Sequence, residues 1–221
     1  LFLTGTMDMA EDESMAVIAT PVLSNAVERL EGPWSPGAHA LRGMVPLRRG
    51  DAVRGPAYTI RLRRAAKPAS TNVEALLKAY DDAPAGSVVV VDVVDEVGGA
   101  VLGDIIAHRL KAIGVAGVVV AGPVRDLIGL EEFGPPIWYA QATMLGLEMA
   151  ETATEVQIEL SVGGTRVAPG DLVFADIDGA FVVPEATMAA LTPIAAGVTA
   201  REEQWHRSLA EGRSLLETLR A

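Results

Sequence analysis

Two runs of small apolar residues in the middle of the chain constrain its fold more than any other feature. The first, Ser87 to Val94, reads SVVVVDVV, and the second, Val115 to Ala121, is equally apolar. Unbroken apolar runs of this length indicate strands that are buried on both faces, as in parallel sheets. Between them, Asp104 to Leu110 carries Ile, Ala and Leu at helical spacing, and the pattern ends near Gly114. The order strand, helix, strand predicts a right-handed parallel crossover.

Charged residues follow both Gly-containing turns of this predicted crossover. Asp104 comes directly after Gly103, and Arg125 and Asp126 directly follow the Gly122–Pro123–Val124 turn. In a parallel crossover both turns lie at the carboxyl ends of neighbouring strands, where α/β proteins bind their ligands. We therefore expect Asp104, Arg125 and Asp126 to lie together at this edge of the sheet, although they are distant in sequence. The site that these three residues would form is called the mouth.

The residue types at this mouth indicate a small anion bound together with a divalent metal. The Arg125 guanidinium is a planar fork that suits a carboxylate. Asp104 and Asp126 are hard oxygen donors that suit Mg²⁺ or Mn²⁺. The first backbone N–H groups of the helix, on Asp104, Ile105 and Ile106, favour an anion. An alternative stays open, in which Asp104 is only a helix cap and Arg125–Asp126 only a surface ion pair.

The composition excludes several classes of function. A formal net charge of −11 and the absence of a dense Lys/Arg surface argue against a nucleic-acid partner. The chain has no cysteine, which excludes disulfides, thiolate catalysis and Cys-based zinc sites and fits a cytoplasmic protein. No apolar run approaches the length that spans a bilayer, so no membrane partner is expected. The first residues, LFLTG, lack the basic segment of a signal peptide.

The remaining elements are expected from local patterns. The chain is long enough for one domain with a large core. Trp34, in the loop EGPWSP, is expected to plug the edge of that core. Spacing and turn residues predict these further elements: a helix over 14–30, a strand over 55–63, a helix over 72–80, a strand over 155–160, turns at 163–164, 169–171 and 176–179, and helices over 185–221 with breaks near Pro193 and Gly197.

Three blocks of sequence carry a resemblance to a known family. The Asp104 to Arg125–Asp126 spacing, with GVAGVVVAGPVRD around it, resembles the class II pyruvate aldolases. A second block, VGGTRVAPGDLVFADIDGAFVVP over residues 162–184, is similar to the same family, and a weaker third match lies at residues 54–59. The family includes aldolases for 4-hydroxy-4-methyl-2-oxoglutarate and 4-carboxy-4-hydroxy-2-oxoadipate. It also includes the regulator of ribonuclease E activity A.

The resemblance implies a fold, an oligomer and an activity. The implied fold is a layered β/β/α "swivelling" α/β domain with a mixed sheet, and the implied assembly is a homotrimer, or a hexamer of two paired trimers, with sites between subunits. The implied activity is cleavage of a 4-hydroxy-2-oxo dicarboxylic acid to pyruvate and a 2-oxo acid, with Mg²⁺ or Mn²⁺ as cofactor. Decarboxylation of oxaloacetate is expected as a side activity, because it passes through the same enolate.

The resemblance also assigns roles to the residues of the mouth. Asp126 is expected to hold the metal. Arg125 is expected to bind the substrate carboxylate or keto oxygen and to stabilise the enolate. Asp104 is expected to orient the water that protonates it. The backbone of Gly103, Asp104, Ile105 and Ile106 would complete the anion site.

Two departures from the family pattern bear on the substrate. After Asp126 the family often carries another acid, whereas this chain has Leu127–Ile128–Gly129, and its next acids are Glu131 and Glu132. The next strand usually reads Pro-Val-Phe-Ala-x-Gly, whereas residues 136–142 read PIWYAQA. If that strand end borders the pocket, Trp138, Tyr139 and Gln141 are expected to change the choice of substrate.

The polar C-terminal segment suggests a role between subunits. We expect one catalytic domain over residues 1–196 and a helical extension over 197–221 that packs on a neighbouring subunit. The resemblance implies that such an extension delivers an acid to the next subunit's site, with Glu202 the better match and Glu203 the second choice. The alternative is that these are simply solvated helix charges. Because the shorter ribonuclease regulators generally lack the extension, its presence favours the enzyme over a non-catalytic, protein-binding regulator.

Overall fold

The computed structural model describes residues 18–220, which divide into two compact units. Residues 37–185 form one unit, called the sheet unit here. The described residues up to Pro36 and from Ala186 onward form the other, called the helical unit. The expected helical start near residue 14 and the segment LFLTG lie outside the described residues.

The sheet unit is built on a mixed sheet of nine strands within the described residues. The order across the sheet is β1-β11-β10-β3-β4-β5-β6-β2, and β7 pairs with β3. The strands from β3 to β6 are parallel neighbours and the other pairs are antiparallel, which confirms the predicted mixed sheet with parallel crossovers at its centre. The strands are β1 (Ala40–Leu41), β2 (Val45–Pro46), β3 (Val53–Arg64), β4 (Val88–Val93), β5 (Gly117–Val124), β6 (Ile137–Ala142), β7 (Thr152–Val156), β10 (Leu172–Asp176) and β11 (Gly179–Val183).

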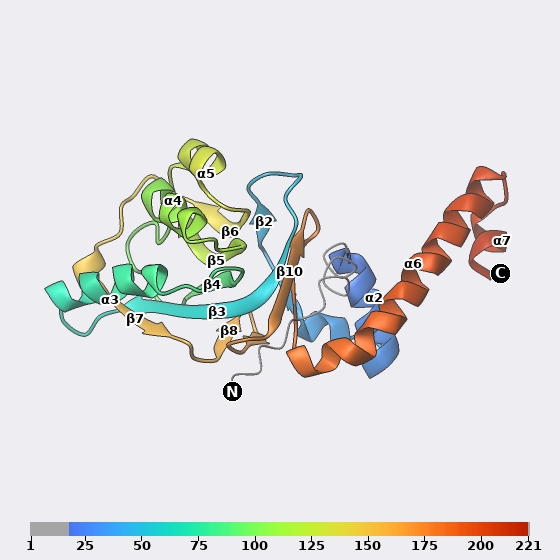
Figure 1. Cartoon of the computed structure of the whole chain (residues 1–221), viewed down its shortest axis with the longest axis horizontal. Coiled ribbons are helices and arrows are strands. Elements are labelled where there is room, and N and C mark those ends of the chain that lie inside the picture. Colours follow the sequence, from blue (N-terminus) through green and yellow to red (C-terminus); the bar gives the residue numbers. More distant parts are fainter. Residues whose placement is uncertain (1–17, 221) are drawn as a thin grey trace, which may run out of the picture. The chain divides into compact units, whose positions relative to one another are not determined.

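The long strand β3 connects the two halves of this sheet (Figure 1). Its first residues, Val53 to Pro56, pair with β10. From Ala57 onward it pairs with β4, and its last residues also pair with β7. One strand therefore continues from the antiparallel β10–β11 hairpin into the parallel strands that carry the predicted crossover.

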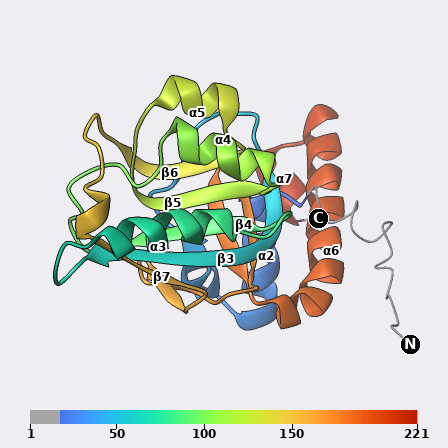
Figure 2. The ribbon, with the colours of Figure 1, turned by 60° about the vertical axis from the view of Figure 1, so that its left-hand side comes forward.

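Three helices cover one face of the parallel strands (Figure 2). They are α3 (Ser70–Asp81), α4 (Asp104–Ala112) and α5 (Leu127–Phe133). Leu76, Leu110 and Leu130, one from each helix, are fully buried in the same core cluster as Val91 and Val120 of the sheet. Burial of such aliphatic side chains is the main stabilising contribution at this layer.

The opposite face is covered by strands rather than helices. The hairpin β8 (Leu160–Val162) and β9 (Thr165–Val167) contributes Leu160 and Val167 to a second core cluster, which also holds Val90 and Trp138. Trp138 is fully buried, and its Nε1–H donates to the Asp176 carbonyl oxygen at 2.6 Å. A β layer, a central sheet and a helical layer confirm the expected β/β/α arrangement.

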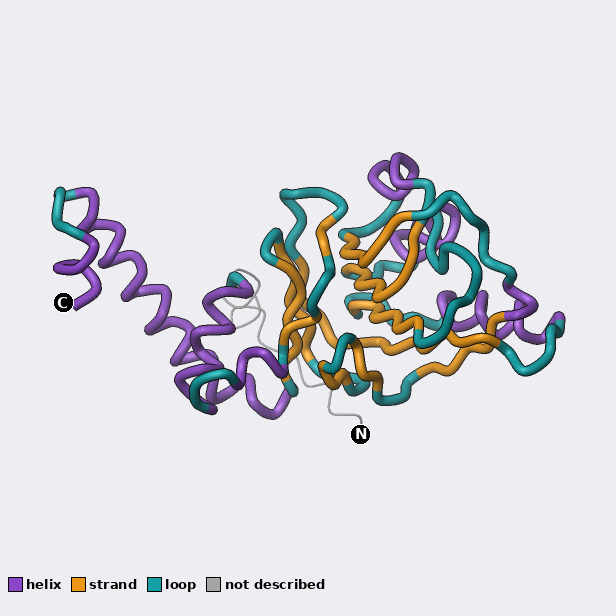
Figure 3. The backbone as a smooth tube through the Cα atoms, turned by 180° about the vertical axis from the view of Figure 1, so that it is seen from behind, coloured by secondary structure: helices purple, strands orange, loops and turns teal. Residues whose placement is uncertain are grey.

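The helical unit consists of α2 (Thr20–Glu31), α6 (Met188–Ala210) and α7 (Leu215–Arg220) (Figure 3). Short 3-10 turns lie at Ser35–Ala38 and Glu185–Thr187 in this part of the sequence and at Met149–Glu151 in the sheet unit. Helix α2 packs on α6, whose buried residues all lie between Met188 and Val198. The second half of α6 is mostly exposed, as its polar sequence predicted.

The expected breaks near Pro193 and Gly197 are wrong, because α6 is one continuous helix through both residues. Pro193 removes one backbone donor only two turns from the helix start. The Thr192 hydroxyl donates to the Met188 carbonyl oxygen at 2.8 Å and so adds a local bond at this turn. The expected domain boundary between residues 196 and 197 consequently falls inside a helix.

Other local expectations are corrected in detail. Trp34 is 92% exposed and adopts a φ of 75°, so the prediction that it plugs the core is wrong. The strand expected over 155–160 is divided between β7 and β8, because Gln157 has a φ of 53° that no strand accommodates. The helix expected over 72–80 begins two residues earlier, at Ser70, and its N-cap residue Ala69 makes no side-chain cap. Within residues 18–220, no helix is long and apolar enough to cross a membrane.

Candidate functional site

Backbone pairing at the end of β5 brings the two predicted charged segments together. Leu102 and Val124 form an isolated parallel bridge, and the Arg125 N–H donates to the Leu102 carbonyl oxygen at 3.0 Å. The Val101 N–H likewise donates to the Pro123 carbonyl oxygen at 2.9 Å. The segment that leads into α4 therefore pairs with the last residues of β5 and continues the sheet beyond the end of β4. As a result, Gly103–Asp104 lies beside Arg125–Asp126, where the crossover topology placed them.

Asp126 occupies a special backbone position between β5 and α5. It has the left-handed conformation, with φ 58° and ψ 44°, which Asp tolerates better than most residues. Its carbonyl oxygen accepts the Leu130 N–H at 2.8 Å, so it is the N-cap residue of α5. Its Oδ2 lies 3.1 Å from Arg125 Nε, and both side chains are a little under half exposed. The pair is thus accessible to a ligand and is held by the turn itself.

Glycines allow the close approach of the acidic side chains at this mouth. A Cβ atom built on Gly103 would lie 3.0 Å from Asp126 Oδ2 and 3.5 Å from Arg125 Nε. A Cβ atom built on Gly129 would lie 2.7 Å from the Asp104 Cβ. Asp104, Arg125 and Asp126 therefore share one small region of the sheet unit, with backbone rather than side chains between them.

Asp104 also serves its own helix. It is the first residue of α4, and its Oδ1 accepts the Ile105 N–H at 2.8 Å. A carboxylate at this end is favoured by the helix dipole. The N-cap of α4 is Gly103, which makes no side-chain cap, so Asp104 is not the N-cap. Its contact with Ile105 engages one of the N–H groups that were expected to face an anion. The anion-binding role of the backbone from Gly103 to Ile106 stays a prediction.

The donor set of the mouth fits a metal ion that keeps most of its water. Asp126 and Asp104 contribute hard carboxylate oxygens beside an open face. Among residues 18–220, no group of three or more His, Cys, Asp or Glu side chains is arranged to hold a metal. A closed, all-protein cage is therefore not formed by the described residues. Mg²⁺ and Mn²⁺ accept one or two carboxylates with water and substrate oxygens completing the shell, and this mouth can supply that.

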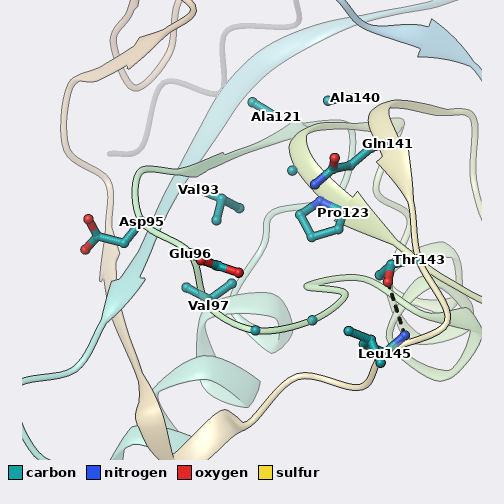
Figure 4. Close-up of a pocket in the computed structure, with 13 residues that line it drawn as sticks. Val93, Asp95, Glu96, Val97, Ala121, Pro123, Ala140, Gln141, Thr143 and Leu145 are labelled. Carbon is teal, nitrogen blue, oxygen red and sulfur yellow. Dashed lines mark hydrogen bonds between the residues drawn. The ribbon is translucent and has the colours of Figure 1, made fainter.

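A pocket of about 460 Å³ lies next to this mouth, at the carboxyl ends of β4, β5 and β6 (Figure 4). Its wall does not include Asp104, Arg125 or Asp126, but it includes Pro123, two residues before Arg125. It is lined by Val93, Asp95, Glu96, Val97, Gly98, Gly99, Ala121, Gly122, Pro123, Ala140, Gln141, Thr143 and Leu145. Of the residues expected to alter the substrate choice, Gln141 lines the pocket, whereas Trp138 is buried elsewhere.

The expected acids of the extension lie in the helical unit. Glu202 is half-buried, and its Oε1 accepts a hydrogen bond from the Asn25 side-chain amide at 3.2 Å. Glu203 is exposed and lies 3.9 Å from Arg207 on the same helix. Neither belongs to the unit that holds the mouth, and their catalytic role stays a prediction.

Comparison with known proteins assigns the chain to a family. A family profile described as RraA-like, Aldolase/RraA, matches residues 20–182. The chain belongs to the RraA-like family. A protein of Halalkalibacterium halodurans provisionally named 4-hydroxy-4-methyl-2-oxoglutarate aldolase is 33% identical over 140 residues. The matched segment is 63% of this chain and 63% of that relative, so the chain spans less than two thirds of its length.

Two solved structures share the RraA-like fold over almost the whole chain. An uncharacterised protein from Pseudomonas syringae pv. tomato has a TM-score of 0.80 and 24% identity, covering 99% of this chain and 96% of its own. Streptomyces coelicolor RraAS2, described as an unusual member of the RNase ES inhibitor RraA protein family, has a TM-score of 0.72 and 27% identity. It covers 94% of this chain and 98% of its own.

The likeness to RraAS2 corrects one inference from the sequence. The presence of the C-terminal extension was expected to favour the enzyme over a regulator. Residues 1–196 are only 196 of the 221 residues, about 89%, so a match over 94% of the chain must include part of the extension. A member of the inhibitor family therefore has a comparable segment, and the extension does not separate the two functions.

Sequence reasoning missed two features of the sheet unit. Glu96 lines the pocket, and it could have been found because it follows the carboxyl end of β4 by three residues. Asp92 is buried on β4, where its Oδ2 lies 3.7 Å from Arg61 Nε on β3. Burial raises the pKa of the Asp92 carboxyl, and the Arg61 guanidinium opposes this. A single Asp within the run SVVVVDVV was the available signal.

Proposed function

We propose that this RraA-like protein is a divalent-metal-dependent lyase that cleaves a 4-hydroxy-2-oxo acid to pyruvate and a second carbonyl compound. Oxaloacetate decarboxylation is proposed as its side activity. The observation that carries the proposal is the meeting of Arg125, Asp126 and Asp104 at one accessible mouth. The family and the 33% identity to a protein provisionally named as an aldolase support it.

Each residue of the mouth has a distinct part in this proposal. Asp126 would hold Mg²⁺ or Mn²⁺, which supplies a Lewis acid to the 2-oxo group when bound. Arg125, whose guanidinium is partly exposed, would bind the carboxylate and the keto oxygen of the substrate. Its positive charge would stabilise the negative charge that develops on that oxygen in the enolate.

The proposed reaction breaks the bond between C3 and C4 of the substrate. The C4 hydroxyl would pass its proton to the water molecule that Asp104 orients and become a carbonyl, and the bonding electron pair would become the enolate of pyruvate. The same water molecule would return a proton to C3, which yields pyruvate. Oxaloacetate would lose carbon dioxide to form the same enolate, so both reactions need the same residues.

The decisive experiment measures pyruvate release, coupled to lactate dehydrogenase, from oxaloacetate and from 4-hydroxy-4-methyl-2-oxoglutarate. Turnover is expected with Mg²⁺ or Mn²⁺ and is expected to stop with EDTA. Asp126→Asn is the matched variant, because Asn also tolerates the left-handed conformation but has no charge. A sample without enzyme corrects for spontaneous decarboxylation of oxaloacetate.

A second readout tests the metal site without turnover. Binding of Mn²⁺, followed by electron paramagnetic resonance, is expected for the wild type and is expected to be weakened at least tenfold in Asp126→Asn. Asp81→Asn serves as the control, because Asp81 is an exposed acid at the end of α3 that forms a 2.7 Å ion pair with Arg109. Equal Mn²⁺ binding by wild type and Asp126→Asn would contradict the assignment of Asp126.

The likeness to RraAS2 favours one further candidate, a protein-binding regulator without turnover. Such a protein would act through its surface on an endoribonuclease. Binding to a ribonuclease E-type enzyme and inhibition of its RNA cleavage, together with no pyruvate release under any metal condition, would support the regulator and contradict the lyase.

The proposed assembly is a homotrimer, or two trimers paired as a hexamer, in which the acid Glu202 reaches the mouth of a neighbouring subunit. The exposed second half of α6 is the observation that supports a role between subunits. Analytical ultracentrifugation at several concentrations is the measurement, and a stable monomer would contradict it.

A further inference from the structure

The polar groups of the pocket beside the mouth define what it can bind. Only Asp95 and Glu96 are charged among the residues that line it, and both are acidic. Figure 4 shows that the Glu96 carboxylate points into the pocket, whereas the Asp95 side chain points away from it. Asp95 Oδ2 instead accepts the Arg64 N–H at 3.3 Å. The lining therefore holds one inward carboxylate and no cationic side chain.

Gln141 gives the pocket a neutral polar group opposite Glu96. Its amide points into the same space in Figure 4. Thr143 lies farther along the wall, where its hydroxyl oxygen accepts the Leu145 N–H at 3.2 Å. The Glu96 carboxylate is an acceptor only, whereas the Gln141 amide both donates and accepts. A ligand hydroxyl can donate to the first and accept from the second.

The pocket is close enough to Arg125 to hold the far end of the same substrate. Pro123 in its wall is two residues from Arg125, and two residues of chain span at most about 7 Å. The other wall continues to Arg125 as well, because a Cβ atom on Gly146, the neighbour of Leu145, would lie 3.0 Å from Arg125 Nη1. A six-carbon 2-oxo acid with its carboxylate on Arg125 can therefore extend into the pocket.

A second carboxylate on the substrate would be disfavoured there. It would lose water, find no cationic partner and face the Glu96 carboxylate. A neutral hydroxyl-bearing chain meets groups that satisfy its hydrogen bonds. We propose, on the basis of the lyase function proposed above, that the pocket selects 4-hydroxy-2-oxo acids with a neutral, hydroxylated tail over the dicarboxylic acids expected from the family resemblance. The second product is then a hydroxylated aldehyde.

The test compares a six-carbon substrate with a five-carbon substrate that carries a carboxylate instead of a hydroxylated tail at its far end. One is a 3-deoxy-2-oxo aldonic acid with hydroxyl groups on C4, C5 and C6, and the other is 4-hydroxy-2-oxoglutarate. We expect kcat/KM for pyruvate formation to favour the hydroxylated substrate by at least tenfold in the wild type. Glu96→Gln, which keeps the shape and removes the charge, is expected to narrow that ratio about tenfold.

Asp95→Asn is the matched control, because it removes the same charge from the neighbouring residue whose side chain points away. It is expected to change the substrate ratio by less than about twofold, because its side chain points away from the pocket and its charge is screened by solvent. An equal change in the ratio for both variants would show a general charge effect and would overturn the role of Glu96.

Exchange of the pyruvate methyl protons in D₂O, followed by NMR, separates failure of this inference from failure of the proposed function. This exchange needs the mouth, where the enolate forms, but pyruvate has no tail that could enter the pocket. Exchange by the wild type together with a preference for the dicarboxylate, or a ratio unchanged in Glu96→Gln, would overturn the pocket's selectivity and leave the lyase standing. No exchange and no cleavage of either substrate would overturn the lyase itself, and the inference with it.

Discussion

Gly103 and Asp126 are in such close approach that a single added carbon on Gly103 would lie 3.0 Å from the Asp126 carboxylate. The two residues lie 23 positions apart in sequence, on either side of the α4–β5 crossover. The left-handed conformation of Asp126 and the bridge between Leu102 and Val124 together produce this approach. The position of the proposed metal ligand therefore depends on the absence of a side chain at residue 103.

Gly103→Ala is expected to lower kcat/KM by about 10- to 100-fold, because the methyl group would displace Asp126 Oδ2 by roughly a few tenths of an ångström. The free energy of unfolding should change by less than about 1 kcal/mol, since the displaced side chains are partly exposed. Kinetics of pyruvate release and chemical denaturation measure the two effects separately.

Gly50→Ala is the control for that substitution. A Cβ atom on Gly50 would meet nothing within 4 Å, and its backbone is not in the left-handed region. It should therefore leave kinetics and stability near those of the wild type. If Gly103→Ala behaves in the same way, the packing between residue 103 and Asp126 has no part in the function.

Arg125→Lys tests whether the mouth needs the guanidinium fork or only a positive charge. Lysine keeps the charge, but it cannot bind a carboxylate at two points and has no Nε to keep the 3.1 Å contact with Asp126 Oδ2. We expect kcat/KM to fall by roughly 10²- to 10³-fold. The methyl-proton exchange of pyruvate should fall in parallel, and wild-type rates in both assays would refute the role of Arg125.

The crossover and its mouth were predictable because their signals are long and mutually consistent. Continuous apolar runs identify β4 and β5, and the parallel connection then places both following turns at the same edge of the sheet. Asp104, Arg125 and Asp126 meet for that topological reason, which needs no knowledge of side-chain packing.

Features that depend on tertiary packing or on single backbone angles could not be predicted in the same way. The left-handed conformation of Asp126 and the bend at Gln157 each concern one residue, for which no periodic pattern exists. Trp34 is a large apolar side chain, so burial was the natural expectation, yet it is 92% exposed. The inward direction of Glu96 is set by the loop after β4 and by its neighbours in space.

The buried Asp92 predicts a pH-dependent stability of the sheet unit. Burial raises the pKa of its carboxyl above the unfolded value of about 3.9, so the folded protein holds this proton more tightly than the unfolded chain. The stability from this group is fully present below that value and is lost as pH rises through the folded-state pKa. Asp92→Asn should remove this loss, so the free energy of unfolding of the variant should vary less than that of the wild type as pH rises from 4.

Chemical denaturation between pH 4 and 7 measures this difference. Asp178→Asn is the control, because Asp178 is an exposed acid in the turn between β10 and β11 and should leave the pH dependence as it is. If Asp92→Asn and the wild type show the same pH profile, the Arg61 guanidinium at 3.7 Å offsets the burial of Asp92 completely.

Glu202 offers a test of whether one subunit completes the mouth of another. Glu202→Gln keeps the oxygen that accepts the 3.2 Å hydrogen bond from Asn25, so its fold should be intact, but it cannot exchange a proton as an acid does. Activity should fall by at least tenfold. Glu203→Gln is the control, since it loses only an exposed contact with Arg207 at 3.9 Å, and it should stay active.

Coexpression of Glu202→Gln with the inactive Asp126→Asn then decides where Glu202 acts. If each site takes its mouth from one subunit and its acid from the next, about one quarter of the sites in a random mixed oligomer carry both intact halves. Activity should therefore return to about a quarter of the wild-type value, although each variant alone has at most about a tenth of it. A mixed oligomer that is as inactive as its parents would show that Glu202 does not supply an acid to a neighbouring mouth.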